Sequence, residues 1–310
     1  MRSQVTASAP ASLLVLQINF EAAFLGLIGP LVIAAAILAV AFRPWIPAPA
    51  AFELAEEIEE EERGWGGALA VGVAFAVGFV ATQGWPPLPP DLGIKHWLFY
   101  AALGTALIGA YEALADRSSC VTRGIVSFAA PFLMLARVRR AQWNGFEATL
   151  WLAFLTLSLI GLWTALDSLA RKRRGATLPM AWCLCGLLAA GALQLSGSFS
   201  LAQLAASLAS ALVPCAVLGL WRPSILWAPG AIAPFCLTYL GLVWGGHFSA
   251  ELSFPSFLLL AVAPLLPALA ELPRTSSRRS RAALAVLFAA LPALVAVLIE
   301  YVTAPEPLYG

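Results

Sequence analysis

Charge is scarce in this chain. Only 11% of its 310 residues are charged, whereas a soluble domain carries about 25%. The net charge is +1, so no strongly basic face indicates a nucleic-acid partner. Lysine occurs only as Lys95 and Lys172, and the preference for arginine, with abundant alanine, indicates a bacterial chain. So little polar surface excludes an ordinary soluble fold.

Motifs of catalysis and cofactor binding are missing as well. The sequence has no Gly-rich phosphate loop, no catalytic serine elbow, no H-E-x-x-H pair and no C-x-x-C pair. Cys183 and Cys185 are two apart and point to different sides of a helix, which disfavours a disulfide framework or a zinc site. We therefore expect no cofactor and no metal, and we favour a non-enzymatic role. The five cysteines, expected to be small buried apolar residues, are Cys120, Cys183, Cys185, Cys215 and Cys236.

Long apolar runs dominate the sequence. Hydrophobic residues make up 61% of the chain, and the mean hydropathy is +0.85. In a bilayer only helices and closed barrels satisfy their backbone groups, and these runs are too uniformly apolar for barrel strands. This predicts an all-α, polytopic transmembrane bundle without a soluble domain. Ten runs approach the roughly 20 residues of a spanning helix, namely Phe20–Phe42, Trp65–Thr82, Trp97–Ala115, Gly124–Ala136, Phe146–Leu166, Leu178–Leu195, Leu201–Trp221, Ile225–Trp244, Phe254–Leu272 and Ala282–Tyr301.

The first and the fourth of these runs differ from an ordinary span. The first has 23 residues, longer than the apolar core of a signal peptide, so we expect it to be the first spanning helix. The fourth, Gly124–Ala136, has only 13 residues between two arginines, or about 20 Å of helix. Three alternatives stay open for it: a tilted span, a span extended by its flanks, or a re-entrant segment.

The basic residues predict the orientation. With ten spans, the odd-numbered loops hold 13 of the 18 lysines and arginines, and basic loops remain in the cytoplasm. Both termini are then expected on the non-cytoplasmic side of the inner, cytoplasmic membrane. The cluster of Arg137, Arg139 and Arg140 falls on the outer side and departs from the rule.

The first loop, residues 43–64, is acidic. Residues 53–62 hold seven of the 17 acidic residues of the chain. A solvated linker is the ordinary role of such a run of like charges, and the alternative is a docking patch for a basic protein partner. The residues expected to make that contact are Glu56, Glu57, Glu59, Glu60, Glu61 and Glu62.

Glu112 is a charged residue within the third apolar run. Ala101, Thr105, Gly109 and Glu112 follow one helical face, and small residues on one face allow close packing in lipid. Glu112 is therefore expected to point into the bundle. It is either an ion-pair partner of a nearby arginine, Arg117 or Arg123, or a proton or cation site.

A polar stripe follows the seventh run. Gln203, Ser207, Ser210 and Pro214 are spaced by four, three and four residues, and Gln194 ends the sixth run. Such groups form hydrogen bonds between helices. The alternative is a lined path for a polar solute.

Prolines interrupt several runs and suggest an internal repeat. Dividing the ten runs into five and five, near residues 170–177, pairs the fourth with the ninth. Ala130-Pro131-Phe132-Leu133 then corresponds to Ala263-Pro264-Leu265-Leu266, and arginines follow each. Transporters use broken helices at equivalent positions of inverted repeats.

The two histidines, His96 and His247, fall near the predicted outer surface. Interfacial loop positions account for them, and the alternative is a pair of haem or metal ligands. We therefore favour transport of a small neutral or lipid-like solute. A non-catalytic structural or assembly subunit of a membrane complex is the first alternative, and an enzyme acting on lipid-linked substrate at the outer face is the second.

Overall fold

The computed structural model of the chain describes residues 11–42, 64–88, 93–115, 120–228, 230–271 and 278–303. The side chains of residues 11–23 and 271–279 lie outside this description, as does the acidic segment 53–62. Within the described residues all regular structure is helical, which confirms the all-α part of the predicted fold class.

Eleven α-helices and one 3-10 helix make up the described chain. They are α1 (Ala11–Phe42), α3 (Trp65–Gln83), α4 (Ile94–Leu114), α5 (Cys120–Met134), α6 (Ala136–Gln142), α7 (Gly145–Lys172), α8 (Thr177–Leu195), α9 (Phe199–Trp221), α10 (Ile232–Ser249), α11 (Phe254–Val262), the 3-10 helix η1 (Ala263–Glu271) and α12 (Arg278–Thr303).

Seven of these helices, α1, α3, α4, α7, α8, α9 and α12, are long and apolar enough to cross a membrane, and the bent pair α5–α6 would make an eighth. Much of their apolar surface is exposed, since only 28% of the most apolar part of α12 is buried. Exposed apolar surface of this extent is not stable in water. The protein is therefore a polytopic membrane protein.

The packing of α12 is typical of a helix in lipid. Its large side chains face outward, and Leu287, Leu291 and Leu298 are each more than half exposed. Its inner face carries small residues, including the fully buried Ala285 and Ala289. Small residues let helix backbones approach closely where lipid surrounds the bundle.

The fourth predicted segment, Gly124–Ala136, forms a bent helix pair and no straight span. Helix α5 ends at Met134, shortly after Pro131, and the chain turns by 52° into α6. Proline weakens the helix because it lacks an N–H and its ring clashes with the preceding turn. Arg139 and Arg140 occupy the last turn of α6.

The eighth predicted segment starts later than expected, at Ile232 instead of Ile225. The residues before it are engaged by the loop between α7 and α8. Gly175 N donates to Ile225 O at 2.8 Å, and Trp227 Nε1 donates to Gly175 O at 2.7 Å. These bonds hold the backbone in a loop conformation, so the predicted helix start was wrong.

The ninth predicted segment, Phe254–Leu272, is a broken helix. Helix α11 ends at Val262 and continues as the 3-10 helix η1. Pro264 has no N–H for the carbonyl of Leu260, and the hydroxyl of Tyr239 on α10 donates to that oxygen at 2.9 Å. The segment is therefore interrupted beside Pro264, as its prolines predict.

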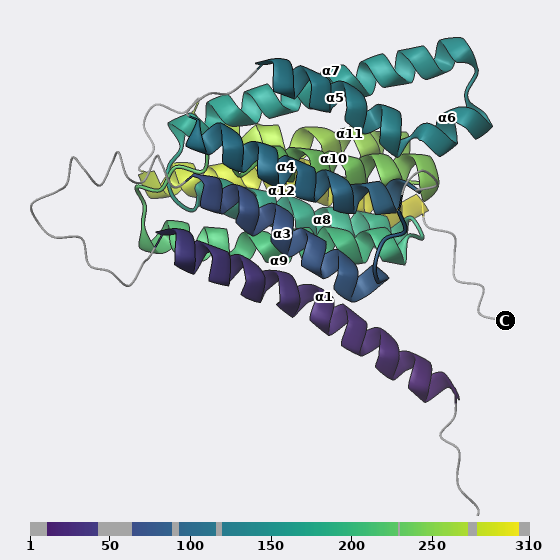
Figure 1. Cartoon of the computed structure of the whole chain (residues 1–310), viewed down its shortest axis with the longest axis horizontal. Helices are drawn as coiled ribbons and strands as arrows, with labels where there is room; N and C mark the ends of the chain where they lie inside the picture. The colour runs from purple at the N-terminus through teal and green to yellow at the C-terminus, as the bar shows by residue number, and fades with distance from the viewer. Residues whose placement is uncertain are drawn as a thin grey trace, which may run out of the picture.

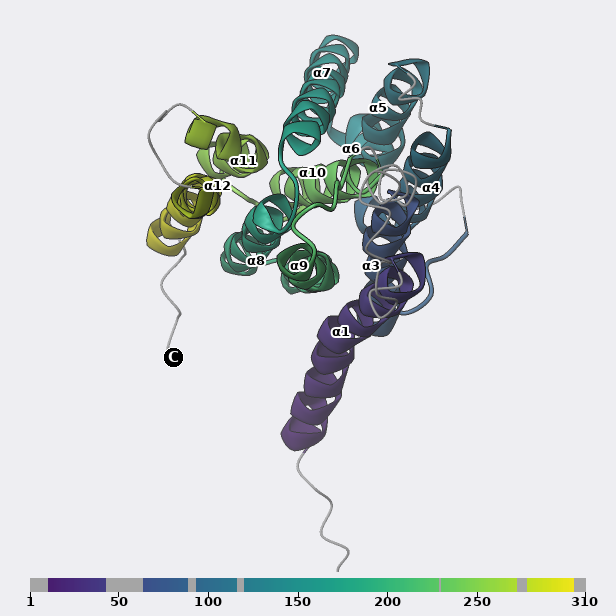
Figure 2. The ribbon, with the colours of Figure 1, turned by 90° about the vertical axis from the view of Figure 1, so that its left-hand side faces the viewer.

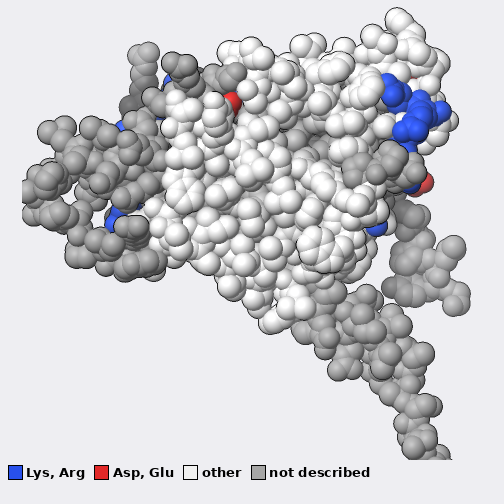
Figure 3. All heavy atoms as spheres, in the orientation of Figure 1, with Lys and Arg blue, Asp and Glu red and all other residues white. Residues whose placement is uncertain are grey.

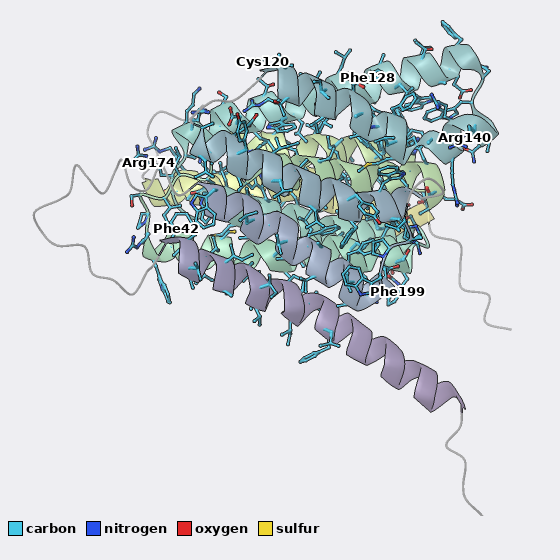
Figure 4. All side chains as sticks on the ribbon, in the orientation of Figure 1. Phe42, Cys120, Phe128, Arg140, Arg174 and Phe199 are labelled. Carbon is cyan, nitrogen blue, oxygen red and sulfur yellow. The ribbon has the colours of Figure 1, made fainter. Side chains whose placement is uncertain are left out.

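Consecutive segments run back and forth between two ends of the bundle (Figure 1). Phe42, Cys120 and Arg174 lie at or toward one end, here called the Phe42 end, and Arg140 and Phe199 lie at the other, the Phe199 end (Figure 4). On the face seen in Figure 3, charged side chains are confined to the ends and the surface between them is uncharged. An uncharged band between charged ends is what a bilayer requires.

Helix α10 lies at the centre of the bundle (Figure 2). Every residue from Ile232 to Gly246 is buried, and the helix contacts α3, α4, α5, α7, α8, α9 and α11. Just before α10, Gly230 meets α4 backbone to backbone. A Cβ on Gly109 would lie 2.4 Å from the carbonyl oxygen of Gly230, so this approach requires glycine.

Candidate functional site

Three charged residues from three helices meet near the Phe42 end. Glu112 of α4, Arg123 of α5 and Asp167 of α7 are 1%, 8% and 7% exposed. One guanidinium nitrogen of Arg123 lies 3.1 Å from Asp167 Oδ2 and 3.6 Å from Glu112 Oε2. We call these three residues the charged cluster. The inward direction of Glu112 and its pairing with Arg123 agree with the helical face expected from its sequence.

Two further side chains of α7 complete the surroundings of the cluster. Arg171, four residues after Asp167, places its Nε 3.4 Å from Asp167 Oδ2, with 42% of its own side chain exposed. The ring of Trp163, four residues before Asp167, lies under the Arg123 guanidinium at 5.5 Å. The spacing of four residues puts all three on one face of α7.

The cluster retains hydrogen-bonding capacity. Within the described part of the chain, Arg123 Nε and Asp167 Oδ1 are buried without a hydrogen-bond partner. The hydroxyl of Ser127, one turn after Arg123, is also buried without a hydrogen-bond partner among the described residues. Buried polar atoms are ordinarily paired. Arg123 Nε and the Ser127 hydroxyl could donate to a water molecule or polar ligand group, and Asp167 Oδ1 could accept from one.

Among the described residues, the two carboxylates share Arg123, and Arg171 reaches Asp167 from a partly exposed position. Arg117, the other arginine expected near Glu112, lies outside the described residues.

An apolar cavity of about 200 Å³, open to the surroundings of the bundle, lies beside the cluster. Ile108 is four residues before Glu112, and Val126 is three residues after Arg123, so the cluster is one helical turn from the cavity on both helices. The cavity is lined by Trp97, Tyr100, Ala101, Gly104, Thr105 and Ile108 of α4, by Val126, Ala129, Ala130, Leu133 and Met134 of α5, and by Leu237 of α10.

The hydroxyls of the predicted stripe on α9 bind the backbone of α1. Ser207 Oγ donates to Gly26 O at 2.7 Å, and Ser210 Oγ donates to Leu27 O. Gly26 is four residues before Pro30, which has no N–H to offer to that carbonyl. The Ser207 hydroxyl therefore replaces the backbone N–H that residue 30 would donate if it were not proline. This is a structural role.

The two glutamines of the stripe line a cavity. Gln194 and Gln203 line a cavity of about 260 Å³ between α1, α3, α8 and α9, and Gln83 Nε2 donates to Gln203 Oε1 at 3.3 Å. Pro214, at the other end of the stripe, faces a separate apolar groove between α1 and α9. Gly26, whose carbonyl oxygen accepts from Ser207, lines the same cavity as the two glutamines.

The two histidines have separate surroundings. His96, in the first turn of α4, packs its ring on Phe79 at 6.3 Å. His247, near the end of α10, lies 4.8 Å from the ring of Phe257 and places its Nδ1 2.8 Å from Leu252 O. Among the described residues no three His, Cys, Asp or Glu side chains gather as metal ligands.

Two buried acids were not singled out from the sequence. The fifth predicted segment ended at Leu166, but α7 continues to Lys172, which places Asp167 inside the helix. Its signal was the four-residue spacing to Trp163 and Arg171. Glu300, 4% exposed, accepts from the N–H and the hydroxyl of Ser253 at 3.1 and 2.6 Å, and so satisfies the first turn of α11.

Comparisons of the chain with protein-family models, with curated proteins and with solved structures found no match.

Proposed function

We propose that the protein is a transporter of a small neutral or lipid-like solute, with ten crossings in two inverted repeats that divide near residues 170–177. One observation carries the proposal: the fourth and ninth segments, equivalent under this division, are both interrupted helices. Helix α5 ends just after Pro131 and α11 ends just before Pro264. Secondary transporters build their substrate sites from such helices.

The pairing of helices also supports the repeat. The second and seventh segments, α3 and α9, pack together, and so do the third and eighth, α4 and α10. Equivalent helices of two repeats meet in this way next to a pseudo-two-fold axis. The pair α1–α3 likewise corresponds to α8–α9, and α5–α7 corresponds to α11–α12.

The cavity between α4, α5 and α10 is the proposed solute site. Its walls carry no charged side chain, and the hydroxyl of Thr105 donates to Ala101 O at 2.6 Å within its own helix. This lining suits a neutral solute. The charged cluster, one turn away, is the proposed gate: neutralising Glu112 breaks its ion pair with Arg123 and lets α5 move from α4.

Thiol labelling tests whether the cavity lies on a solute path. Ala129→Cys, in a chain whose native cysteines are replaced, is treated with a membrane-impermeant maleimide in right-side-out and in inside-out vesicles. We expect reaction from one aqueous side, and Glu112→Gln should change the reactivity from the Phe42 end by about tenfold, the effect of a 1.4 kcal/mol shift between two states.

Val213→Cys is the matched control. It lines the α1–α9 groove, which has a similar volume of about 290 Å³ and is expected to face lipid. It should react only with a lipid-soluble maleimide. The transport proposal fails if Ala129→Cys behaves in the same way in both vesicle orientations and with both residues at position 112.

Purification separates the transporter from the subunit alternative. The tagged protein, extracted in mild detergent, is expected to purify alone or with further copies of itself. Stoichiometric co-purification of other membrane proteins would instead favour a subunit, with the acidic segment 53–62 as its first candidate contact.

Ten crossings make a separate prediction about topology. Reporter fusions after Ala115 and Asn144, which flank α5 and α6, should report opposite sides of the membrane, and so should fusions after Arg222 and Ala250, which flank α10. We expect the fusions after Ala115 and Arg222 in the cytoplasm, where the basic loops would place the Phe42 end. Identical results within either pair would rule out the ten-crossing arrangement.

A further inference from the structure

The groove between α8, the end of α9 and the start of α12 has a volume of about 990 Å³, several times that of the proposed solute cavity. Met180 and Leu184 of α8 line one wall, and Val286 and Leu287 of α12 line the other. Met180 and Leu287 are 41% and 55% exposed. The groove therefore opens to the surroundings of the bundle along its apolar walls.

One end of this groove is basic. Arg174 lines it directly, and the exposed Arg281 immediately precedes the lining residue Ala282. Arg222 immediately precedes another lining residue, Pro223. None of the described lining residues is Asp or Glu. Among the described residues, three arginines thus lie at or next to the mouth of the groove, at the Phe42 end, where Arg174 is seen in Figure 4.

Backbone hydrogen bonds fix the loop at the mouth of the groove. Gly175, which follows Arg174, has a φ of +81° that favours glycine. Its N–H and carbonyl bind Ile225 and the indole of Trp227, so both sides of the residue are held. A Cβ there would lie 3.1 Å from the carbonyl oxygens of Gly219 and Pro223. Arg174 is therefore positioned by a fixed loop.

We propose that this groove binds one anionic phospholipid. The phosphate lies at the mouth between Arg174 and Arg281, and one acyl chain lies along Met180, Leu184, Val286 and Leu287. Basic pockets between transmembrane helices recognise anionic headgroups in this way. Thr177, at the mouth, begins α8, so the positive end of that helix dipole adds to the attraction. The apolar walls beyond the mouth favour a lipid over free phosphate.

Lipid titration of the purified full chain tests the site. Phosphatidylglycerol or phosphatidylcholine is added to the protein in neutral detergent, and the thermal unfolding midpoint and the lipid retained in native mass spectra are measured. We expect phosphatidylglycerol to raise the midpoint and to remain bound at one copy per chain, whereas phosphatidylcholine does neither.

Two kinds of variant separate the headgroup from the chain. Arg174→Gln with Arg281→Gln removes two charges at the mouth and should weaken phosphatidylglycerol binding roughly 30-fold. Ala283→Trp fills the apolar wall without changing charge and should also reduce retention. Arg137→Gln with Arg140→Gln removes two exposed charges at the Phe199 end and should leave binding unchanged.

Three results would overturn the proposal. Equal stabilisation by the two lipids would show that charge is not recognised. Equal loss in the Arg137 and Arg140 control would place recognition elsewhere. Competition by inorganic phosphate, with Ala283→Trp unaffected, would indicate an anion site without an acyl chain. The site is independent of transport, so failure of the solute-path experiments leaves this test intact.

Discussion

The charged cluster of α4, α5 and α7 and the hydroxyl stripe of α9 are both polar groups within apolar helices, yet they differ in what they satisfy. Ser207 donates to a carbonyl that Pro30 leaves without an N–H, so the stripe completes the backbone of α1. In the cluster, by contrast, Arg123 forms ion pairs with Glu112 and Asp167, and among the described residues Arg123 Nε and Asp167 Oδ1 have no hydrogen-bond partner. The role of a polar residue in a membrane helix, structural or functional, is therefore better inferred from its hydrogen-bond and ion-pair partners than from its occurrence in the sequence.

The largest effect is expected from removing the shared cation. Arg123→Met leaves two buried carboxylates without their common partner and should lower the free energy of unfolding by about 3–5 kcal/mol. Unfolding of the purified protein in detergent, followed by denaturant titration, measures the loss. Adding Glu112→Gln and Asp167→Asn to the same chain should restore most of it, because no buried carboxylate then lacks its cation. Wild-type stability of the single variant would contradict the pairing.

The backbone contact that supports the cluster comes next. Gly109→Ala places a Cβ 2.4 Å from Gly230 O, and overpacking of this kind costs roughly 1–3 kcal/mol. Gly104→Ala, on the same helix, meets nothing within 4 Å and is the matched control. Thermal unfolding of both variants should separate them clearly. If they unfold at the same temperature, the close approach of α4 to Gly230 is wrong.

The hydroxyl stripe should respond less, and in a way that depends on Pro30. Ser207→Ala removes an interhelical hydrogen bond worth about 0.6 kcal/mol on average and at most about 1.7. In a Pro30→Ala background, the restored N–H can bind Gly26 O, so the effect of Ser207→Ala should fall by at least half. A double-mutant cycle measures this coupling, and additive effects would refute it. Ser200→Ala, on the same helix, is the control.

The smallest effect is expected at the exposed arm of the cluster. Arg171 is 42% exposed at its side chain, and ion pairs of this kind contribute about 0.2–1 kcal/mol. Arg171→Gln should lower stability within that range, and added salt should reduce the difference from wild type. A loss as large as that of Arg123→Met would show that Arg171 belongs to the buried cluster.

Several features followed from sequence alone. Low charge and long apolar runs predicted the helical membrane bundle, because lipid admits little else. Helical spacing placed Glu112 on the small-residue face of its helix, where it is 1% exposed. Prolines marked the segments that the structure breaks, at Pro131 and Pro264, but α1 and α12 continue through Pro30 and Pro292. All of these depend on one segment at a time, and the period of the helix suffices for them.

Other features were decided only by the tertiary structure. The bonds of Gly175 to Ile225 and Trp227 delayed the start of α10, and no local pattern in either segment announces a contact between distant loops. Asp167 joined Glu112 and Arg123 because α7 extends past its apolar run and turns that face toward α5. Which acid meets which arginine depends on the rotation and depth of neighbouring helices. Those are set by packing between helices, and periodicity within one helix carries no information about them.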